Sequence, residues 1–164
     1  MRGLTHRAVD RAANLPPGTT SAYYRTRQAL LTALVQRLVA LDQAELQAIG
    51  KKTPVPRNAE ELVAGITAFV GRRLTGEGRQ RSLARYACAI ESVHHPELRE
   101  ILVPRENVGR EVVRDFLAGQ GFADAEERTI TLLTCVDGLV FDRLVAGGSV
   151  CEKEIRRMVA TTLR

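Results

Sequence analysis

Residues 5–31 read T-H-R-A-V-D-R-A-A-N-L-P-P-G-T-T-S-A-Y-Y-R-T-R-Q-A-L-L, and this stretch decides the fold. Thr5 can cap a first helix with its hydroxyl, and apolar residues recur after it at helical spacing. Asn14 tolerates the left-handed backbone of a helix exit, and the two prolines that follow cannot continue that helix. Pro17 suits the first turn of a second helix, which we expect to end at Tyr24. The stretch therefore predicts two short helices, a tight turn between them and the start of a third.

The second helix begins with small hydroxyl residues that a purely structural helix would seldom carry. Gly-Thr-Thr-Ser at 18–21 places poor helix formers in its first two turns. Hydroxyl groups at the start of a helix suit phosphate oxygens and base edges. Thr26 then caps a third helix with an apolar stripe, which we expect to run to about Ile49. This pattern indicates a surface that faces a nucleic acid.

These residues resemble the reading segment of TetR-type (tetracycline repressor-like) transcriptional regulators, T-x-R-x-I-A-x-x-A-G-V-S-x-G-T-L-Y-Y-H-F-x-S-K-E-E-L-L. The positions that match without a gap are Thr5, Arg7, Val9, Ala13, Leu15, Gly18, Thr19, Tyr24, Thr26, Arg27, Leu30 and Leu31. Asn14 replaces the turn Gly, and Pro16 replaces a Ser. Ser21 and Ala22 stand where the family has aromatic residues, so contacts made there do not carry over. A generic helical hairpin with a Pro turn is the alternative, but gap-free spacing over this length disfavours it.

Charge is unevenly distributed along the chain, whose formal net charge is +5. Residues 1–40 hold six arginines and one aspartate, whereas the remainder holds 18 basic and 18 acidic residues. The whole excess therefore lies on the predicted head, as is typical of a surface that binds phosphates. A solvated basic face is the alternative. The coincidence of this excess with the two-helix pattern favours DNA.

Composition excludes several other classes of protein. No apolar run approaches the length of about 18 residues that a membrane span needs, and no signal-peptide core follows the start. Cys88, Cys135 and Cys151 lack metal-type spacing, so we expect reduced core thiols in a cytoplasmic protein. No Ser-His-Asp set, carboxylate pair, phosphate loop or metal cluster stands at a meaningful spacing. We therefore expect no enzyme, no metal, no cofactor and no membrane partner.

Helical periodicity continues to the end of the chain, and no segment alternates with strand period, so we expect an all-α fold. Breaks rich in Gly and Pro separate helices that we place at 26–49, 58–74, 79–93, 97–118, 124–146 and 150–162. Pro104 should kink or divide the fourth of these. We divide the chain into a helix-turn-helix head, residues 1–40, and a larger helical body, residues 41–164. In the resembled family a further helix precedes the one at Thr5, so we expect an incomplete and loosely held head.

The last two helices are expected to form a homodimer. The helix at 124–146 is apolar on more than one face, and more than one protomer's core should be needed to hide it. The resemblance implies that these helices pair with those of a second copy, and two-fold heads match a palindromic operator. A monomeric bundle is the alternative. The expected interface residues are Leu132, Leu139, Phe141, Val145, Ile155, Met158 and Val159.

The resemblance also implies a small-molecule cavity in the body, formed by the middle helices. Its expected lining is Phe69, Arg73, Tyr86, Ile90, Phe116, Leu133, Val136 and Asp137. Ordinary core packing is the alternative for each of them. Aromatic residues make up only 4% of the chain, and Trp is absent, so a large stacked ligand is not indicated.

Together these features predict a ligand-responsive regulator, a repressor that a small molecule releases from its operator. Its partners would be a double-stranded DNA operator, an effector of unknown identity and a second copy of the chain. Thr19, Thr20, Ser21 and Tyr23 are expected to face the major groove or its phosphates. The DNA backbone is expected to contact Thr5, Arg7, Tyr24 and Arg27. The alternative is a helical oligomerisation or partner-binding protein without DNA binding.

Overall fold

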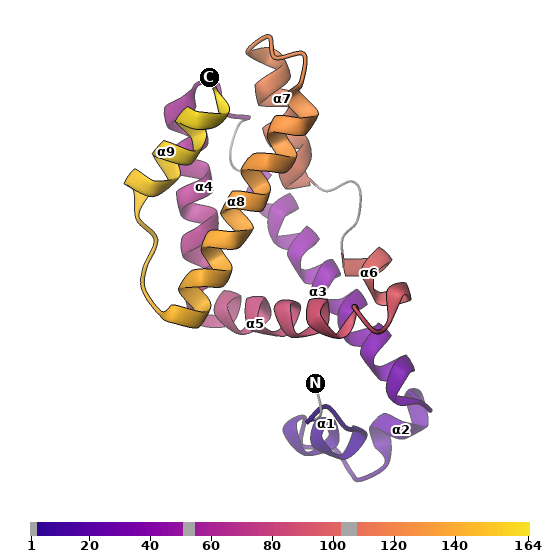
Figure 1. Cartoon of the computed structure of the whole chain (residues 1–164). Helices are drawn as coiled ribbons and strands as arrows, with labels where there is room; N and C mark the ends of the chain where they lie inside the picture. Colours follow the sequence, from indigo (N-terminus) through magenta and orange to yellow (C-terminus); the bar gives the residue numbers. More distant parts are fainter. Residues whose placement is uncertain (1–2, 51–54, 103–107) are drawn as a thin grey trace. The chain divides into compact units, whose positions relative to one another are not determined.

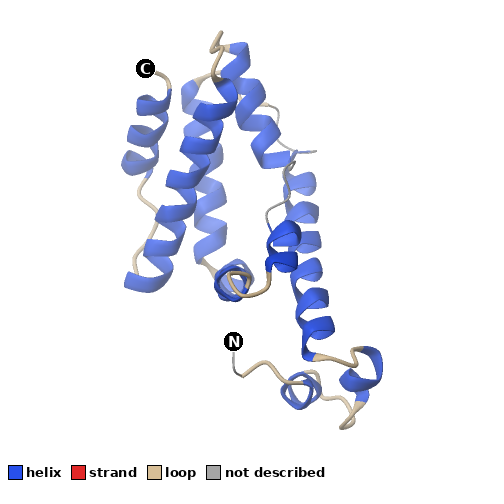
Figure 2. Ribbon diagram, turned by 45° about the vertical axis from the view of Figure 1, so that its right-hand side comes forward, coloured by secondary structure: helices blue, strands red, loops and turns tan. Residues whose placement is uncertain are grey.

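The computed structural model describes residues 3–50, 55–102 and 108–164, and all regular structure in these ranges is helical (Figures 1 and 2). The predicted all-α class is therefore confirmed. The elements are α1 (His6–Ala12), α2 (Thr19–Tyr23), α3 (Arg27–Gly50), α4 (Ala59–Leu74), α5 (Gly76–Glu91), α6 (Pro96–Leu102), α7 (Val108–Gly119), α8 (Ala125–Ala146) and α9 (Glu152–Thr162). In the described ranges no helix has the length and apolar character that a bilayer crossing requires.

Most helix bounds lie close to the predicted ones, but α5 does not. The sequence predicted a break at 76–78, whereas α5 begins at Gly76, directly after the single connecting residue Thr75. A Cβ built on Gly78 would lie 2.0 Å from the carbonyl oxygen of Arg72. Gly78 thus permits the close approach of α5 to the end of α4 and does not interrupt the helix. The expected kink at Pro104 lies outside the described residues.

The chain forms two compact units that do not follow its order. The first unit comprises residues 1–42 and 85–104, and the second comprises residues 43–84 and 105–164. The expected border between head and body, after residue 40, lies close to one edge of the first unit. That unit nevertheless also includes residues 85–104, from a distant part of the sequence. Both α3 and α5 contribute residues to each unit.

In the second unit α8 packs against α4, α7 and α9, and α4 also packs against α9 (Figure 1). Arg143 of α8 places Nη2 2.8 Å from both carboxylate oxygens of Glu154 on α9. Burial of apolar side chains is the main source of stability in such a bundle. The residues buried in this unit include Leu62, Val63, Ile66, Val70, Val113, Phe116, Leu117, Leu132, Val136, Leu139, Val140, Leu144, Ile155 and Val159.

The first unit combines an aliphatic core with a partly buried ion pair. Its buried apolar residues are Leu30, Leu31, Val35, Leu38, Cys88, Leu98 and Leu102. Asp42 of α3 is buried, and Arg85 of α5 donates from Nη1 to its Oδ2 at 3.3 Å. The same guanidinium donates from Nη2 to the carbonyl of Leu102 at 2.9 Å. Arg85 therefore ties α3, α5 and α6 together within this unit.

Candidate nucleic-acid interface and body surfaces

The head consists of α1, α2 and the turn between them. The hydroxyl of Thr5 accepts a hydrogen bond from the amide of Ala8 at 3.1 Å, which confirms the predicted cap. Asn14 has a φ of 52°, which confirms the predicted left-handed exit. Gly18 precedes α2 with a φ of 91°, a conformation that favours glycine. Local residue chemistry therefore shapes this turn, although α2 begins at Thr19, two residues later than expected.

A buried carboxylate, that of Asp10 on α1, holds the start of α2. Its Oδ2 accepts from the amide of Gly18 at 2.9 Å, and its Oδ1 accepts from the amide of Thr20 at 2.8 Å. The hydroxyl of Thr20 also donates to Oδ1. The Thr20 hydroxyl bond, followed by the two amide bonds, lowers the pKa of Asp10. An ionised group inside the head therefore satisfies the amides at the start of α2.

Thr20 departs from the expectation that it faces DNA. Thr20 is only 5% exposed, and its hydroxyl donates to Asp10. The physical reason is a contact between α1 and α2 that the spacing of residues along α2 does not reveal. In the pattern quoted above, the positions of Asp10 and Thr20 are Ala and Leu. A hydrogen-bonded polar pair thus stands where the resembled pattern has two apolar residues.

The other residues expected to contact the bases differ in their solvent exposure. Tyr23 is 80% exposed and Ser21 is exposed, while Thr19 is half-buried. The hydroxyl of Thr19 donates to the carbonyl of Pro16 at 2.7 Å, and that of Ser21 donates to the carbonyl of Gly18 at 2.9 Å. Each hydroxyl keeps lone pairs that can accept from a base or from water. Tyr23 is therefore open to an outside partner.

The residues expected to meet the DNA backbone lie on α1 and around the start of α3. Thr5 and Arg7 are exposed, and Tyr24 is 37% exposed. The ring Nε2 of His6 lies 2.6 Å from the carbonyl oxygen of Tyr24 and ties α1 to the end of α2. Arg27, the first residue of α3, forms an ion pair with Glu91 in which Nη1 and Oε1 are 3.0 Å apart. Arg27 is therefore held by a residue of α5 that the sequence did not suggest as part of the site.

The eight residues expected to line an effector cavity are not gathered in one unit. Tyr86 and Ile90 belong to the first unit, and the other six belong to the second. Ile90 is 66% exposed, which differs from the expected cavity lining, and Asp137 is also exposed. Phe116 and Val136 are buried, while Phe69, Arg73 and Leu133 are half-buried. On α4 the guanidinium of Arg73 lies 5.0 Å from the centre of the Phe69 ring.

The residues expected at a dimer interface divide into a buried and an exposed set. Leu132, Leu139, Ile155 and Val159 are at most 8% exposed and lie in their own protomer's core. The reason is that α8 packs against three helices, which cover more of its apolar surface than the sequence indicated. Met158 is half-buried. Only Phe141 and Val145 present large exposed surfaces, at 46% and 71%.

One outward face of α8 forms a small apolar stripe. Ile130, Phe141 and Val145 are exposed at helical spacing, and the small residues Thr134 and Gly138 lie between them. We call these five residues the α8 stripe. Over 15 residues a helix rises about 22 Å, so the stripe follows much of the length of α8. An exposed apolar surface of this kind is a candidate for contact with another helix.

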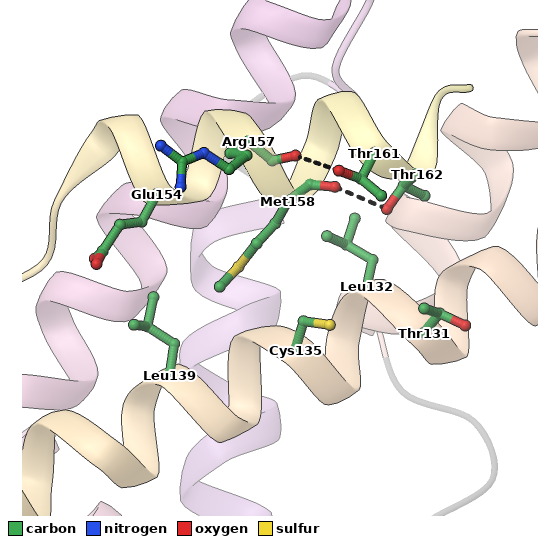
Figure 3. Close-up of a pocket in the computed structure, with 9 residues that line it drawn as sticks. All are labelled: Thr131, Leu132, Cys135, Leu139, Glu154, Arg157, Met158, Thr161 and Thr162. Atoms are coloured by element: carbon green, nitrogen blue, oxygen red, sulfur yellow. Dashed lines mark hydrogen bonds between the residues drawn. The ribbon is translucent and has the colours of Figure 1, made fainter.

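A groove of about 380 Å³ lies between α8 and α9, on the side of α8 next to the stripe. Leu132, Cys135 and Leu139 of α8 point toward Met158 of α9 (Figure 3). Cys135 and Cys151 are exposed, so the expectation of core thiols holds only for Cys88. Burial raises the pKa of the Cys88 thiol. In the described ranges no group of three or more His, Cys, Asp or Glu side chains is placed to hold a metal ion.

Comparison with known families places this body in a class of helical regulators. A family model described as tetracyclin repressor-like, C-terminal domain, matches residues 57–164. This match covers α4 to α9 and more than half of the chain, so the chain belongs to the tetracyclin repressor-like family of regulators. The family suggested by residues 5–31 is thereby confirmed, although the match itself begins after α3. A comparison with curated proteins gives no match.

Proposed function

We propose that this protein is a ligand-responsive transcriptional regulator that binds a DNA operator as a homodimer and is released from it by a small molecule. The observation that carries the proposal is the basic excess of residues 1–40, which includes Arg7 and Arg11 on α1 and Arg27 at the start of α3, in a chain whose body belongs to a regulator family. Phosphate contacts supply most of the non-specific affinity of such heads. In this proposal the protein represses transcription while it is bound to its operator, and binding of the effector ends the repression.

In this proposal α2 enters the major groove, and its flanks hold the DNA backbone. The exposed phenol of Tyr23, with Ser21 and Thr19, faces base edges and phosphates. Thr20 has no part in reading, because its hydroxyl is committed to Asp10. The groups that hold the phosphates are Thr5, Arg7, Tyr24 and Arg27.

The second copy is proposed to dock on the α8 stripe and the adjoining part of α9. Family membership supports pairing through these helices, and the exposed apolar residues Ile130 and Val145 support a contact there. An isologous contact along α8 relates the two copies by a two-fold axis. The two heads then share that axis, which suits a palindromic operator.

The effector is proposed to bind in the body. Phe69, Arg73, Phe116, Leu133 and Val136 lie in the second unit and remain the better-placed candidates for contact. They combine aromatic and aliphatic surface with one cation, which suits a mostly apolar molecule with an acceptor group. To release DNA, the effector must bind the DNA-free state more tightly than the DNA-bound state.

A duplex-selection experiment on the full chain tests the proposal. Binding of a randomised duplex library should show a sequence preference and a steep decrease in affinity with salt. Arg7→Ala should weaken binding to all duplexes and reduce the salt slope by about one for each head. Absence of any preference and of any salt dependence would contradict DNA binding. The α8 stripe would then favour a helical oligomerisation protein.

A further inference from the structure

The first turn of α3 is held by two carboxylates from a distant part of the chain. Arg27 pairs with Glu91, the last residue of α5, with 3.0 Å between Nη1 and Oε1. The next residue, Gln28, donates from its side-chain amide to Glu97 in the first turn of α6. All four residues belong to the first unit, which is the unit that contains the head. The start of α3 therefore has fixed partners on α5 and α6.

The two contacts differ in whether they occupy a positive charge that an outside anion could bind. Gln28 is neutral, so its bond to Glu97 occupies no positive charge. Arg27 is a cation, and Glu91 occupies one edge of its guanidinium while the Arg27 side chain stays 44% exposed. Glu91 is only 18% exposed, and pairing with Arg27 lowers its pKa. Glu91 thus carries a full negative charge at neutral pH, next to a proposed phosphate contact.

We propose that Glu91 is an internal counter-ion that competes with a DNA phosphate for Arg27. This inference rests on the proposed DNA-binding function. A phosphate that approaches Arg27 meets a guanidinium already paired on one edge and a carboxylate that repels it within the Debye length of about 8 Å. Binding must therefore break or share the Arg27–Glu91 pair. The affinity of the head for DNA is then set in part by the position of the last turn of α5.

This ion pair links the proposed DNA-binding surface to the last turn of α5. Glu91 ends α5, and the first residues of α5 belong to the second unit. A change that draws Glu91 away from Arg27 frees the cation for phosphate. A change that holds Glu91 against Arg27 keeps the cation occupied. The effect is a shift between two states of one contact and needs no change in the fold of the head.

The test compares Glu91→Gln with Glu97→Gln in the full chain. Both variants remove one negative charge near the start of α3, but only the first removes the partner of Arg27. An exposed ion pair shifts an equilibrium by about 1.5- to 5-fold. Glu91→Gln should therefore raise the affinity for every duplex by about that factor per head, with a steeper salt dependence and no change in sequence preference. Glu97→Gln should change affinity less.

A double substitution tests whether the effect passes through Arg27. In the Arg27→Ala background, Glu91→Gln should raise affinity no more than Glu97→Gln does. Equal effects of the two Gln variants, or an effect of Glu91→Gln that persists without Arg27, would overturn the inference. So would an Arg27→Ala variant that binds like the wild type, although the proposed function would then stand. A wild-type chain without salt-dependent duplex binding would overturn both.

Discussion

Asp10 shows how a single residue organises the head. It is buried, and its two carboxylate oxygens accept three hydrogen bonds from the start of α2. A buried carboxylate with this many donors remains charged, which agrees with its lowered pKa. The short helix α2 has few other means of orientation, because five residues cannot bury much apolar surface. The carboxylate therefore orients α2, as apolar packing orients longer helices.

We expect Asp10→Ala and Thr20→Leu to be damaging alone and tolerated together. Asp10→Ala leaves two backbone amides and a hydroxyl without an acceptor, and Thr20→Leu forces an apolar side chain against a carboxylate. The double variant recreates the Ala and Leu of the resembled pattern. Thermal unfolding and duplex affinity of all four proteins measure the coupling. Losses that simply add in the double variant would contradict the assigned contact.

The charge of Asp10 also predicts a dependence on pH. Its folded-state pKa lies below the ordinary value of 3.8, so its contribution to stability is present above that value and is lost as the pH falls through the lower folded pKa. The difference in unfolding midpoint between wild type and Asp10→Asn should therefore be largest near neutral pH. It should shrink below about pH 3.8. A difference that stays constant between pH 3 and pH 7 would contradict this role.

The sequence predicted those parts of the head that depend on neighbouring residues. The cap at Thr5 and the left-handed Asn14 follow from local backbone chemistry, and both are present. Burial of Thr20 was not predicted, because it depends on a contact with a residue ten positions earlier. The pairing of Arg27 with Glu91 spans 64 positions and leaves no periodic signal. Side-chain partners far apart in sequence are therefore the part that pattern and spacing did not reveal.

Within a single helix, the effect of a substitution on stability depends on how closely other atoms approach the residue and on how exposed the residue is. Gly78 lies where α5 meets the end of α4, with no space for a Cβ. Gly65 lies within α4, and a Cβ built there would meet nothing within 4 Å. Both are glycines in helices, so the sequence alone treats them alike as helix-weakening residues. The structure separates them by what surrounds each Cα.

We expect opposite effects from alanine at these two glycines. Gly78→Ala should destabilise the protein by about 1–3 kcal/mol, because a backbone carbonyl must move to admit the methyl group. Gly65→Ala should stabilise it by about 0.4–1 kcal/mol, because the unfolded chain loses freedom and the helix gains a better former. Denaturant unfolding measures both changes. If both substitutions changed the free energy of unfolding by the same amount and in the same direction, the close approach at Gly78 would be contradicted.

The α8 stripe yields a prediction about assembly. Val145→Glu places a charge on the exposed stripe and should weaken self-association by about tenfold or more, while the helical content is retained. Leu139→Glu should instead unfold the protein, because Leu139 is only 8% exposed in its own core. Ala64→Glu, on the exposed surface of α4, is the matched control. Sedimentation velocity distinguishes these outcomes, and a Val145→Glu variant that associates like the wild type would exclude the stripe as the interface.

At the scale of the whole molecule, the compact units cut across the order of the chain. A border near residue 40 was predicted from the charge excess and the family pattern, and one edge of the first unit lies at Asp42. The inclusion of residues 85–104 in the first unit was not predictable, because long-range contacts bring it about. Arg85 links to Asp42 and to the carbonyl of Leu102, and Leu98 is completely buried. Helical periodicity indicates which face of α6 is buried, but not which helix covers it.

We therefore expect a core substitution in α6 to loosen the first unit, which contains the head. Leu98→Ala should cost about 2–5 kcal/mol and speed amide exchange in residues 27–42. Leu132→Ala, in the core of the second unit, should instead speed exchange in α4 and α9. Hydrogen exchange resolved by peptide measures both patterns. If both variants increased exchange in the same peptides, the two units would not unfold independently.

The buried pair of Asp10 and Thr20 also limits how this head can diverge during evolution. Base contacts decide which sequence a DNA-binding head prefers, so a new target requires changes on the helix that reads the bases. In the proposed function, one position of α2 is already committed to an internal partner, so target preference changes at Thr19, Ser21 and Tyr23 while Thr20 stays constant. A descendant that regains an apolar pair must change both residues, and each single step passes through a weakened head. Related lineages should therefore carry either the polar pair or the apolar pair, and mixed pairs should be rare.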